Sequence, residues 1–295
     1  MTDSPAADLL RYAAFTADPD GGNPAGVVLD DTGLDDATRL AVAAELGYSE
    51  TAFLAPAAAG GRSFTVRYFS PKAEVPFCGH ATVAAAVAVA ERTGVGELLF
   101  ETKAGPVPVL VEQGPHGLLS ATLTSVEPQV HQVAAADLAE ALAALGWHED
   151  ELDPLLPPRI AYAGARHLVL AAGTRARLAD LAYDFERLAA LMTRLDLTTL
   201  QLVHRESRRV FHVRDPFPVG GVVEDPATGA AAAAFGAYLR ELDGIDDGEL
   251  TLHQGADLGR PGVLRVELRP GDPRIRVSGT AVAITADDGR GPDRG

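Results

Sequence analysis

The sequence predicts an α+β fold of two pseudo-symmetric halves, each with a sheet curled around one central helix. Two Ala-rich segments, 76–86 and 225–234, begin at Gly-containing turns and follow strand-like runs that end in Val-Arg, with an offset of 213 − 66 = 147 residues. Downstream, 100–105 matches 250–255 at an offset of 255 − 105 = 150. This nearly constant offset indicates a duplicated half. Both Ala-rich segments carry alanine on all sides, which is typical of helices buried inside a sheet.

The first half alternates short apolar runs with Gly and Pro turns, a pattern typical of strands. Helical periodicity occurs at 35–46 and at 80–93, and Gly47 and Gly94 close these helices. The run 21–26 looks like a phosphate-binding loop, but its proline and the lack of a following helix predict a tight turn into a strand. The expected strands are 9–15, 25–29, 51–54, 64–69, 98–102, 107–111 and 118–123.

The second half opens with an amphipathic stretch at 134–145 and then crosses a Pro-rich link at 154–158. From there it repeats the scheme of the first half, with a helix at 185–195 and a long helix at 227–242. The duplication places His80 and Thr228 at equivalent helix starts, with an offset of 228 − 80 = 148. The expected strands are 165–171, 197–203, 209–214, 250–252, 262–268 and 274–284.

We expect two half-domains and a short tail. The N-terminal half-domain is 1–128, and the C-terminal half-domain is 129–286, with a last strand that packs back on the first half. The tail, 287–295, consists mainly of Gly, Asp and Arg and is expected to be disordered.

Composition excludes several classes of function. The 25 basic and 41 acidic residues give a net charge of −16, which repels nucleic acid and anionic membranes. A single cysteine, Cys78, excludes an internal disulfide and a thiolate-rich metal site, and it is typical of a reducing compartment. The sequence shows neither a signal-peptide pattern nor an apolar stretch long enough to span a bilayer. We therefore expect a cytoplasmic protein without nucleic-acid or membrane partners.

Four polar residues at element ends are candidates for chemistry, and each has two interpretations. Glu50, at a helix-to-strand junction, is either a strand-edge carboxylate or a general base. His80 either satisfies backbone groups in the first helical turn or carries a proton beside a bound anion. Cys78 is either an inert buried thiol or a group activated by the helix dipole. Asp225, followed by Pro226, is typical of a helix N-cap; its functional interpretation requires that it face the same cleft as Glu50 and His80.

The two helix starts also predict an anion site. Helix N-termini at the seam between the halves would form one cleft, in which Gly79, Gly229 and Ala230 offer backbone N–H groups to a carboxylate or carbonyl oxygen. Phosphate-loop, dinucleotide, nucleophile-elbow and His-Glu-x-x-His motifs are missing from the sequence. The eight His are scattered without metal-ligand spacing, so we expect no metal and no cofactor.

Four motifs occur in a fixed order along the chain. They are Gly22-Asn23-Pro24-Ala25-Gly26-Val27-Val28, Ser49-Glu50-Thr51-Ala52-Phe53, the stretch 67–82 with Pro76-Phe77-Cys78-Gly79-His80-Ala81-Thr82, and Glu224-Asp225-Pro226-Ala227-Thr228-Gly229. Together they resemble the phenazine biosynthesis protein PhzF-like family over 12–284. The resemblance implies the diaminopimelate epimerase-like fold, with mostly antiparallel, barrel-like halves, and a homodimer.

The resemblance also assigns roles to residues. It implies that Glu50 is the catalytic acid/base and that His80 and Asp225 are its supporting polar residues. The substrate-binding residues that it implies are Ser49, Gly79, Thr228, Gly229 and Ala230. Ala230 departs from the family, which has a serine there that helps to hold the substrate carboxylate.

These observations lead us to expect a cofactor-independent isomerase that abstracts and returns a proton through Glu50, on a small carboxylate-bearing substrate. One alternative is epimerase- or racemase-type exchange, with Cys78 or His80 acting on the second face. Epimerases that share this fold use two cysteines, one in each half. The resemblance places Cys78 at one of these positions and Pro226 at the other, so racemisation by two thiols is excluded. The other alternative is a non-catalytic small-molecule-binding homologue, which Ala230 permits and the Glu50-His80-Asp225 set disfavours.

Overall fold

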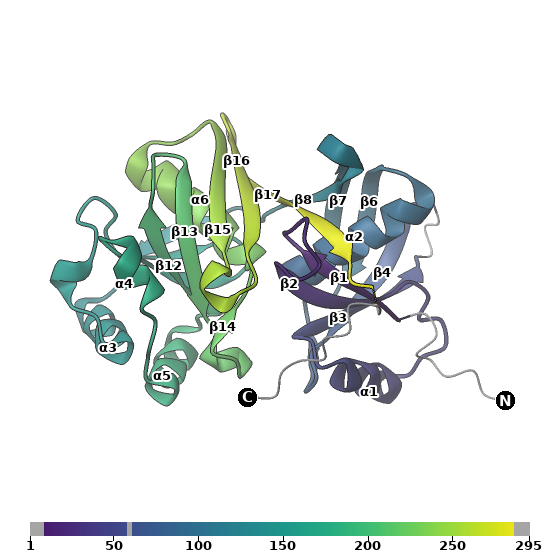
Figure 1. The fold of residues 1–295 in the computed structure, drawn as a ribbon, viewed down its shortest axis with the longest axis horizontal. Helices are drawn as coiled ribbons and strands as arrows, with labels where there is room; N and C mark the ends of the chain where they lie inside the picture. The colour runs from purple at the N-terminus through teal and green to yellow at the C-terminus, as the bar shows by residue number, and fades with distance from the viewer. Residues whose placement is uncertain (1–8, 58–60, 286–295) are drawn as a thin grey trace. The chain divides into compact units, whose positions relative to one another are not determined.

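The computed structural model describes residues 9–57 and 61–285, and the chain divides by its internal contacts into two compact units (Figure 1). Unit 1 comprises the described residues up to Ala121 together with those from Thr280 onward, and unit 2 is Thr122–Gly279. The long strand β17 (Asp272–Ala283) begins in unit 2, and its last residues, which belong to unit 1, pair with β1. The tail at 287–295 lies outside the described residues.

Unit 1 is a curved sheet with one helix inside it. Antiparallel pairs β1–β2, β3–β4 and β6–β7 are joined through the parallel pairs β2–β3 and β4–β6, and the short β5 pairs with β4. The strands are β1 (Leu9–Ala14), β2 (Asn23–Val28), β3 (Glu50–Pro56), β4 (Ser63–Phe69), β5 (Glu74–Val75), β6 (Gly96–Thr102), β7 (Gly105–Gln113) and β8 (Leu119–Thr124), the last of which continues into unit 2.

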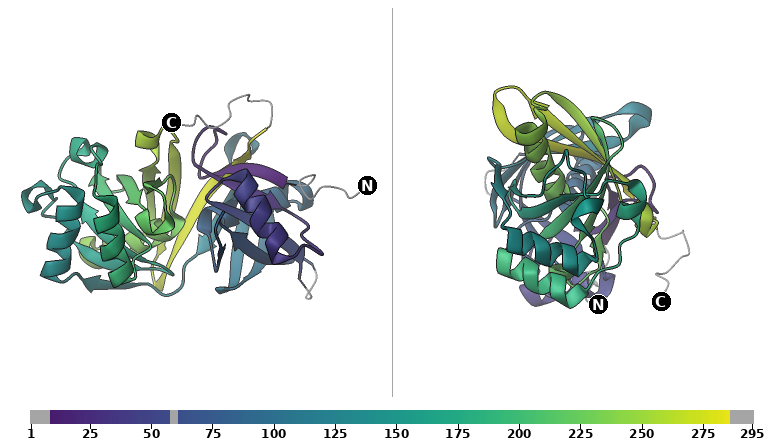
Figure 2. Two further views of the ribbon diagram at one scale, coloured as in Figure 1. Left: turned by 90° about the horizontal axis from the view of Figure 1, so that it is seen from below. Right: turned by 90° about the vertical axis from the view of Figure 1, so that its left-hand side faces the viewer.

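The helix inside this sheet is α2 (Gly79–Thr93), which contacts β1, β2, β3 and β7 (Figure 1). Every residue from 80 to 90 is buried, so the helix has no polar face over that stretch, and its small alanines let strands pass close on all sides. Helix α1 (Asp36–Leu46) packs on β3 and β4 (Figure 2). The Asp35 side chain caps its start, and Gly47, in the left-handed conformation, ends it as the sequence predicts.

Unit 2 has its own sheet and its own buried helix, α6 (Gly229–Asp243), which contacts β9 to β12 and β16. A Cβ added at Gly236 would lie 2.8 Å from a methyl of Val266 and 2.9 Å from one of Ile275, so glycine is what allows this close approach. The strands are β9 (Gln129–Gln132), β10 (Arg159–Tyr162), β11 (Arg166–Ala171), β12 (Thr199–Arg205), β13 (Val210–Pro216), β14 (Glu224–Asp225), β15 (Gly248–Gln254) and β16 (Gly262–Arg269).

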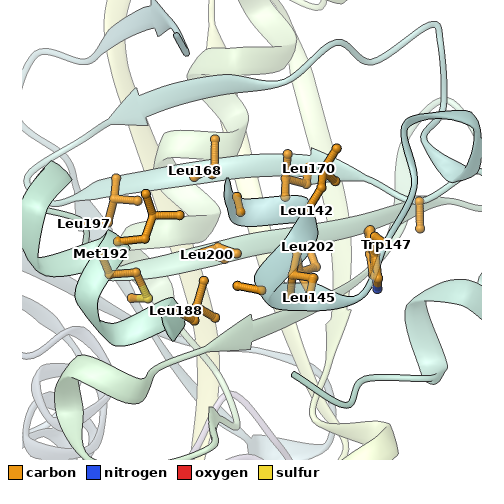
Figure 3. Packing of buried hydrophobic residues seen from close by; sticks show 14 of the residues in the cluster. Leu142, Leu145, Trp147, Leu168, Leu170, Leu188, Met192, Leu197, Leu200 and Leu202 are labelled. Atoms are coloured by element: carbon orange, nitrogen blue, oxygen red, sulfur yellow. The ribbon is translucent and has the colours of Figure 1, made fainter. Parts of the chain in front are cut away.

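A leucine-rich core of unit 2 lies between two helices and the strands that they cover, as Figure 3 shows. Helices α3 (Ala135–Leu145) and α5 (Phe185–Leu195) lie side by side and pack onto β11 and β12 (Figures 2 and 3), while the short α4 (Arg175–Ala179) contacts β12 and β13. Leu168, Leu170, Leu200 and Leu202 of the two strands are fully buried. None of the helices in the described ranges is long and apolar enough to cross a bilayer.

The two units repeat one pairing scheme. In unit 2, β10–β11 is antiparallel, β11–β12 parallel, β12–β13 antiparallel, β13–β15 parallel and β15–β16 antiparallel, which is the order of β1, β2, β3, β4, β6 and β7 in unit 1. An ion pair repeats as well: Arg67 on β4 binds Glu74 on β5 at 2.6 Å, and Arg214 on β13 binds Glu224 on β14 at 2.5 Å. The expected α+β fold of two pseudo-symmetric halves, each a curled sheet around a helix, is confirmed.

The start of α6 corrects three details of the sequence analysis. The N-cap is Thr228, and Asp225 is the last residue of β14, so the N-cap interpretation of Asp225 is wrong. Both central helices have 15 residues and begin at Gly79 and Gly229, which makes Thr228 equivalent to Cys78 rather than to His80. Pro226 therefore does not occupy the position that corresponds to Cys78, and the residue that corresponds to His80 is Ala230.

Candidate active site

Three side chains of chemically different type converge in unit 1. The Nε2 atom of His80 lies 3.4 Å from Oε2 of Glu50, and the Cys78 thiol donates to the same oxygen at 3.6 Å. Cys78 Sγ also lies 3.4 Å from Nδ1 of His80, and Ser49 Oγ lies 3.3 Å from Nε2. His80 and Cys78 are buried, whereas the Glu50 side chain keeps 15% of its surface exposed. The cluster therefore combines a carboxylate, an imidazole and a thiol, with the carboxylate the most accessible of the three.

Local structure explains why these residues meet. Glu50 is the first residue of β3, just after the turn in which Gly47 ends α1. In the parallel register of β2 and β3, Glu50 lies beside Ala25, two residues after Asn23. Cys78 is the N-cap of α2 and His80 its second residue, so the helix start brings both against the ends of two neighbouring strands.

Asn23 sets the protonation of the imidazole. Its side-chain nitrogen lies 3.0 Å from Nδ1 of His80, and both side chains are buried. Because an amide nitrogen only donates, Nδ1 must accept, and the proton of the neutral ring is then on Nε2. Nε2 then carries the proton, within hydrogen-bond distance of Ser49 Oγ at 3.3 Å and 3.4 Å from Glu50 Oε2.

The two oxygens of Glu50 differ. Oε2 faces both the imidazole and the thiol, which fixes the orientation of the carboxylate. Oε1 accepts no hydrogen bond from any residue in the described ranges. It is therefore the oxygen available to exchange a proton with a bound molecule.

A second polar group surrounds Asp225 in unit 2. Thr228 Oγ1 donates to Asp225 Oδ2 at 2.6 Å. The Gln254 side chain holds the turn between them, since its Oε1 accepts from the Thr228 N–H at 3.0 Å and its Nε2 donates to the Asp225 carbonyl at 2.9 Å. Asp225 is buried, and Thr228, Gly229 and Ala230 are partly exposed at the helix start. The carboxylate is thus oriented by two residues from different elements.

Behind Asp225 lies another carboxyl group, Asp215, which is fully buried. Burial raises the pKa of Asp215 well above its usual range, and the nearby negative charge of Asp225 adds to this effect. Thr199 Oγ1 donates to Asp215 at 3.4 Å, and with its amide turned to donate, Gln201 lies 2.5 and 3.1 Å from the two carboxyl oxygens. Burial therefore favours the neutral, protonated form of Asp215 in this buried polar chain.

The series of hydrogen-bonded side chains that includes Asp215 and Thr199 ends at His167, which is also fully buried. Its Nδ1 lies 2.8 Å from Thr199 Oγ1, and burial lowers the pKa of His167 to about 3. The ring is therefore neutral at physiological pH.

Strand registers identify the equivalent positions of the two units. Glu50 is paired with Ala25 across β2–β3, and Thr199 is paired with His167 across β11–β12, each at the first residue of its strand. Three residues later, Phe53 faces Arg67 and Leu202 faces Arg214, so Thr199 occupies in unit 2 the position of Glu50. Since Ala230 corresponds to His80, the carboxylate–imidazole pair belongs to unit 1 alone.

The structure brings together Glu50, His80 and Ser49 in unit 1, and Asp225 and Thr228 in unit 2. The single cleft expected to unite both groups stays a prediction. Sequence reasoning missed Asn23, Gln254 and Asp215. Asn23 stands in the first of the four motifs and could have been noticed there, whereas nothing local marks the other two.

Comparison with known proteins identifies the family of this chain. Residues 12–287 match the family model described as phenazine biosynthesis-like protein. The chain belongs to this phenazine biosynthesis-like family. The uncharacterized isomerase YddE of Escherichia coli is 33% identical over 289 residues, covering 94% of this chain and 96% of YddE.

Two further family members are similar over nearly the full chain. The trans-2,3-dihydro-3-hydroxyanthranilate isomerase of Pseudomonas chlororaphis is 30% identical over 275 residues, covering 92% of this chain and 95% of that protein. The crystal structure of a PhzF-family protein from Bacillus anthracis has a TM-score of 0.83 at 27% identity, covering 94% of this chain and 96% of that one. The sequence predicts an isomerase. YddE and the Pseudomonas chlororaphis protein are both named isomerases, so this class is confirmed.

Proposed function

We propose that the protein is a cofactor-independent isomerase in which Glu50 removes a proton from an activated carbon of a small carboxylate-bearing substrate and returns it to another position. The observation that carries the proposal is the asymmetry of the Glu50 carboxylate: Oε2 is held by His80 and Cys78, while Oε1 is left to exchange a proton. One carboxylate suffices when removal and return occur on the same face of the substrate. General acid–base catalysis of this kind contributes about a hundred- to ten-thousandfold in rate.

In this proposal His80 polarises the substrate as a neutral donor through Nε2–H, and Asp225 positions it. The backbone N–H groups at the starts of α2 and α6 bind the substrate carboxylate, since helix N-termini attract anions. This requires the two helix starts to face one cleft. The helix dipoles act on an anion within a few ångströms, so a protein of net charge −16 can still bind one at these helix starts.

The relative from Pseudomonas chlororaphis suggests a probe. Its name describes an isomerase of trans-2,3-dihydro-3-hydroxyanthranilate, a compound that carries a carboxylate. Ala230 provides a backbone N–H but lacks a hydroxyl that could hold such a group, so we expect this chain to act on a related carboxylate with a weaker demand for that contact. We further propose that the protein is cytoplasmic and that it forms a homodimer. Light scattering on the purified protein tests the dimer directly.

The thiol supports a second candidate function. Cys78 Sγ lies 3.6 Å from Glu50 Oε2 and 3.4 Å from His80 Nδ1, so the site holds a thiol beside the carboxylate as a second group able to exchange a proton. In that reaction the proton is returned to the opposite face of the same carbon. The product's configuration, rather than its double-bond position, then changes.

The deciding experiment follows proton exchange in D₂O with trans-2,3-dihydro-3-hydroxyanthranilate and a panel of small unsaturated carboxylic acids. Glu50→Gln should keep the fold and bind the substrate, and turnover and deuterium uptake should fall about a hundred- to ten-thousandfold. The matched control is Glu101→Gln, an exposed carboxylate on β6. Activity of Glu50→Gln within a few-fold of the unmodified protein would remove Glu50 from the mechanism.

A further inference from the structure

Asp215 and Asp225 form a cross-strand pair of carboxyl groups in unit 2. They stand directly opposite each other in the antiparallel register of β13 and β14. Side chains placed in this way leave the same face of the sheet, with Cβ atoms about 4.5 to 5.5 Å apart. Asp215 is fully buried, and Asp225 keeps 7% of its surface exposed. Two carboxylates this close in a buried setting repel each other, which favours a pair that holds one proton.

The matching pair in unit 1 contains no acid. The ion pair that repeats in both units, on the preceding residue of each strand, makes Tyr68 the equivalent of Asp215. Val75 lies opposite Tyr68 and is therefore the equivalent of Asp225. Unit 1 closes the same part of its sheet with two neutral side chains. The buried acids of unit 2 are therefore not a requirement of the fold.

The charges on β13 and β14 do not neutralise Asp215. The neighbouring cation, Arg214, binds Glu224 at 2.5 Å, so its charge is already engaged. Burial, and after it the negative charges of Asp225 and Glu224, raises the pKa of Asp215. Within the described ranges, neither a lysine nor an arginine forms an ion pair with Asp215.

The strands on the other side of Asp215 offer uncharged partners. Thr199 Oγ1 donates to Oδ1 at 3.4 Å, and the Gln201 amide lies closer to Oδ1, at 2.5 Å, than to Oδ2, at 3.1 Å. Beyond Thr199, the buried ring of His167 is neutral. Since the shorter contacts fall on Oδ1, Oδ2 is the oxygen of Asp215 that can carry a proton.

We infer that Asp215 is a positioning residue of the candidate site: it and Asp225 hold one proton between them, so the pair presents one negative charge beside the start of α6. The proton resides on Asp215, because Asp225 is the more exposed of the two and accepts the Thr228 hydroxyl at 2.6 Å, which stabilises its charged form. The carboxyl pair does not depend on the proposed function.

The role of the pair in binding does rest on the proposed function, which places the substrate carboxylate at the starts of α2 and α6. A second negative charge beside α6 would repel that anion. The affinity for a carboxylate should therefore fall as the pH rises through the pKa of Asp215.

Infrared difference spectroscopy tests the pair on the full-length protein without a substrate. A protonated carboxylic acid has a C=O stretch that a carboxylate lacks and that shifts in D₂O. At pH 7, Asp215→Asn should lose one such band, and Asp225→Asn should keep it at a shifted frequency because the neighbouring charge is gone. The control, Asp246→Asn, alters an exposed carboxylate and should leave the band unchanged. A band that survives in Asp215→Asn, or is unshifted in Asp225→Asn, would overturn the pair.

Binding of anthranilate tests the role of the pair in the site. This aromatic carboxylate keeps the same charge between pH 6 and pH 10, and calorimetry measures its dissociation constant for the unmodified protein and for Asp215→Asn, which cannot ionise at this position. The ratio of the first constant to the second should rise about tenfold or more over this range. A ratio that is constant with pH, or no binding to either protein, would overturn the role of Asp215.

The outcome for the proposed function is separate. An active Glu50→Gln variant refutes the base assignment even when the infrared band behaves as expected. Loss of turnover in Glu50→Gln together with a constant ratio keeps the function and refutes only the role of Asp215.

Discussion

The side-chain nitrogen of Asn23 lies 3.0 Å from Nδ1 of His80, so a buried amide fixes which nitrogen of the candidate catalytic imidazole carries the proton. The contact joins the first residue of β2 to the second residue of α2, 57 positions apart in the chain. Through it, the proton is placed on Nε2, which lies 3.4 Å from Glu50 Oε2.

Replacing Asn23 with Asp should reverse this arrangement. A carboxylate opposite Nδ1 needs a proton on that nitrogen, so the neutral ring would present an unprotonated Nε2 to Glu50 and cease to be a donor. We expect turnover to fall on the order of a hundredfold or more, in line with the cost of a wrong histidine tautomer elsewhere. Long-range ¹H–¹⁵N NMR of the unmodified protein should show the proton on Nε2, and a spectrum with the proton on Nδ1 would refute the assignment.

Replacing Cys78 with Ser separates the two candidate reactions. If Glu50 alone moves the proton, the variant should retain isomerase turnover within about tenfold, because the hydroxyl still donates to Oε2. If the thiol is the second base of an epimerase, exchange on one face of the substrate should be lost. Stereospecific deuterium labelling followed by NMR of the product distinguishes the outcomes.

The buried His167 should make stability depend on pH. Its folded pKa of about 3 lies below the unfolded value of about 6.5, so between these values the unfolded chain binds a proton that the folded protein does not. The stabilisation is fully present above pH of about 6.5 and is lost as the pH falls, with a slope of up to about 1.4 kcal/mol per pH unit.

Urea unfolding between pH 7 and pH 4 measures this contribution. In His167→Gln the amide retains a partner for Thr199 but does not titrate, so the pH dependence should become shallower. The exposed His131→Gln variant should leave the slope unchanged. Equal slopes in all three proteins would contradict the neutral, buried state of His167.

Asp215 should make stability depend on pH in the opposite direction to His167. Its folded pKa is raised by burial and by the charge of Asp225, so above about pH 3.9 the folded protein holds a proton that the unfolded chain has lost. Stability is therefore full below that pH and declines as the pH rises toward the folded pKa. Asp215→Asn cannot ionise, and its stability relative to the unmodified protein should rise between pH 4 and pH 8. A difference that is constant with pH would show that Asp215 is ionised in the fold.

The fold could be predicted where local signals agree with tertiary structure. Gly47 and Gly94 end helices α1 and α2 where the glycine pattern predicts, and α5 has the predicted bounds of 185–195. Strands β9 and β10 and the two-residue β5 and β14 were missed, because they are short and their residues alternate little in polarity. Their sheet partners are neighbouring segments of the chain: β5 pairs with β4, β14 with β13, and β10 with β9 and β11.

The candidate site, like the fold, could be predicted from the sequence only in part. Glu50, His80 and Asp225 could be proposed because they stand at ends of elements and in the motifs of the resembled family. The start of α6 was expected two residues early, at 227 rather than at Gly229, since Asp225-Pro226 has the local chemistry of an N-cap. The side chain of Gln254, 26 residues after Thr228, holds the turn and shifts the cap to Thr228.

The path of β17 has a consequence for biosynthesis. Strand β1 is translated long before residues 281–283, with which one of its two edges pairs. Unit 1, with its candidate base Glu50, therefore cannot close its sheet on the ribosome until unit 2 has been synthesised and residues 281–283 have emerged, whereas unit 2 lies within one continuous stretch. A ribosome that stalls or terminates before Thr280 would release a chain with an open β1 edge, a product prone to aggregation rather than a half-active enzyme.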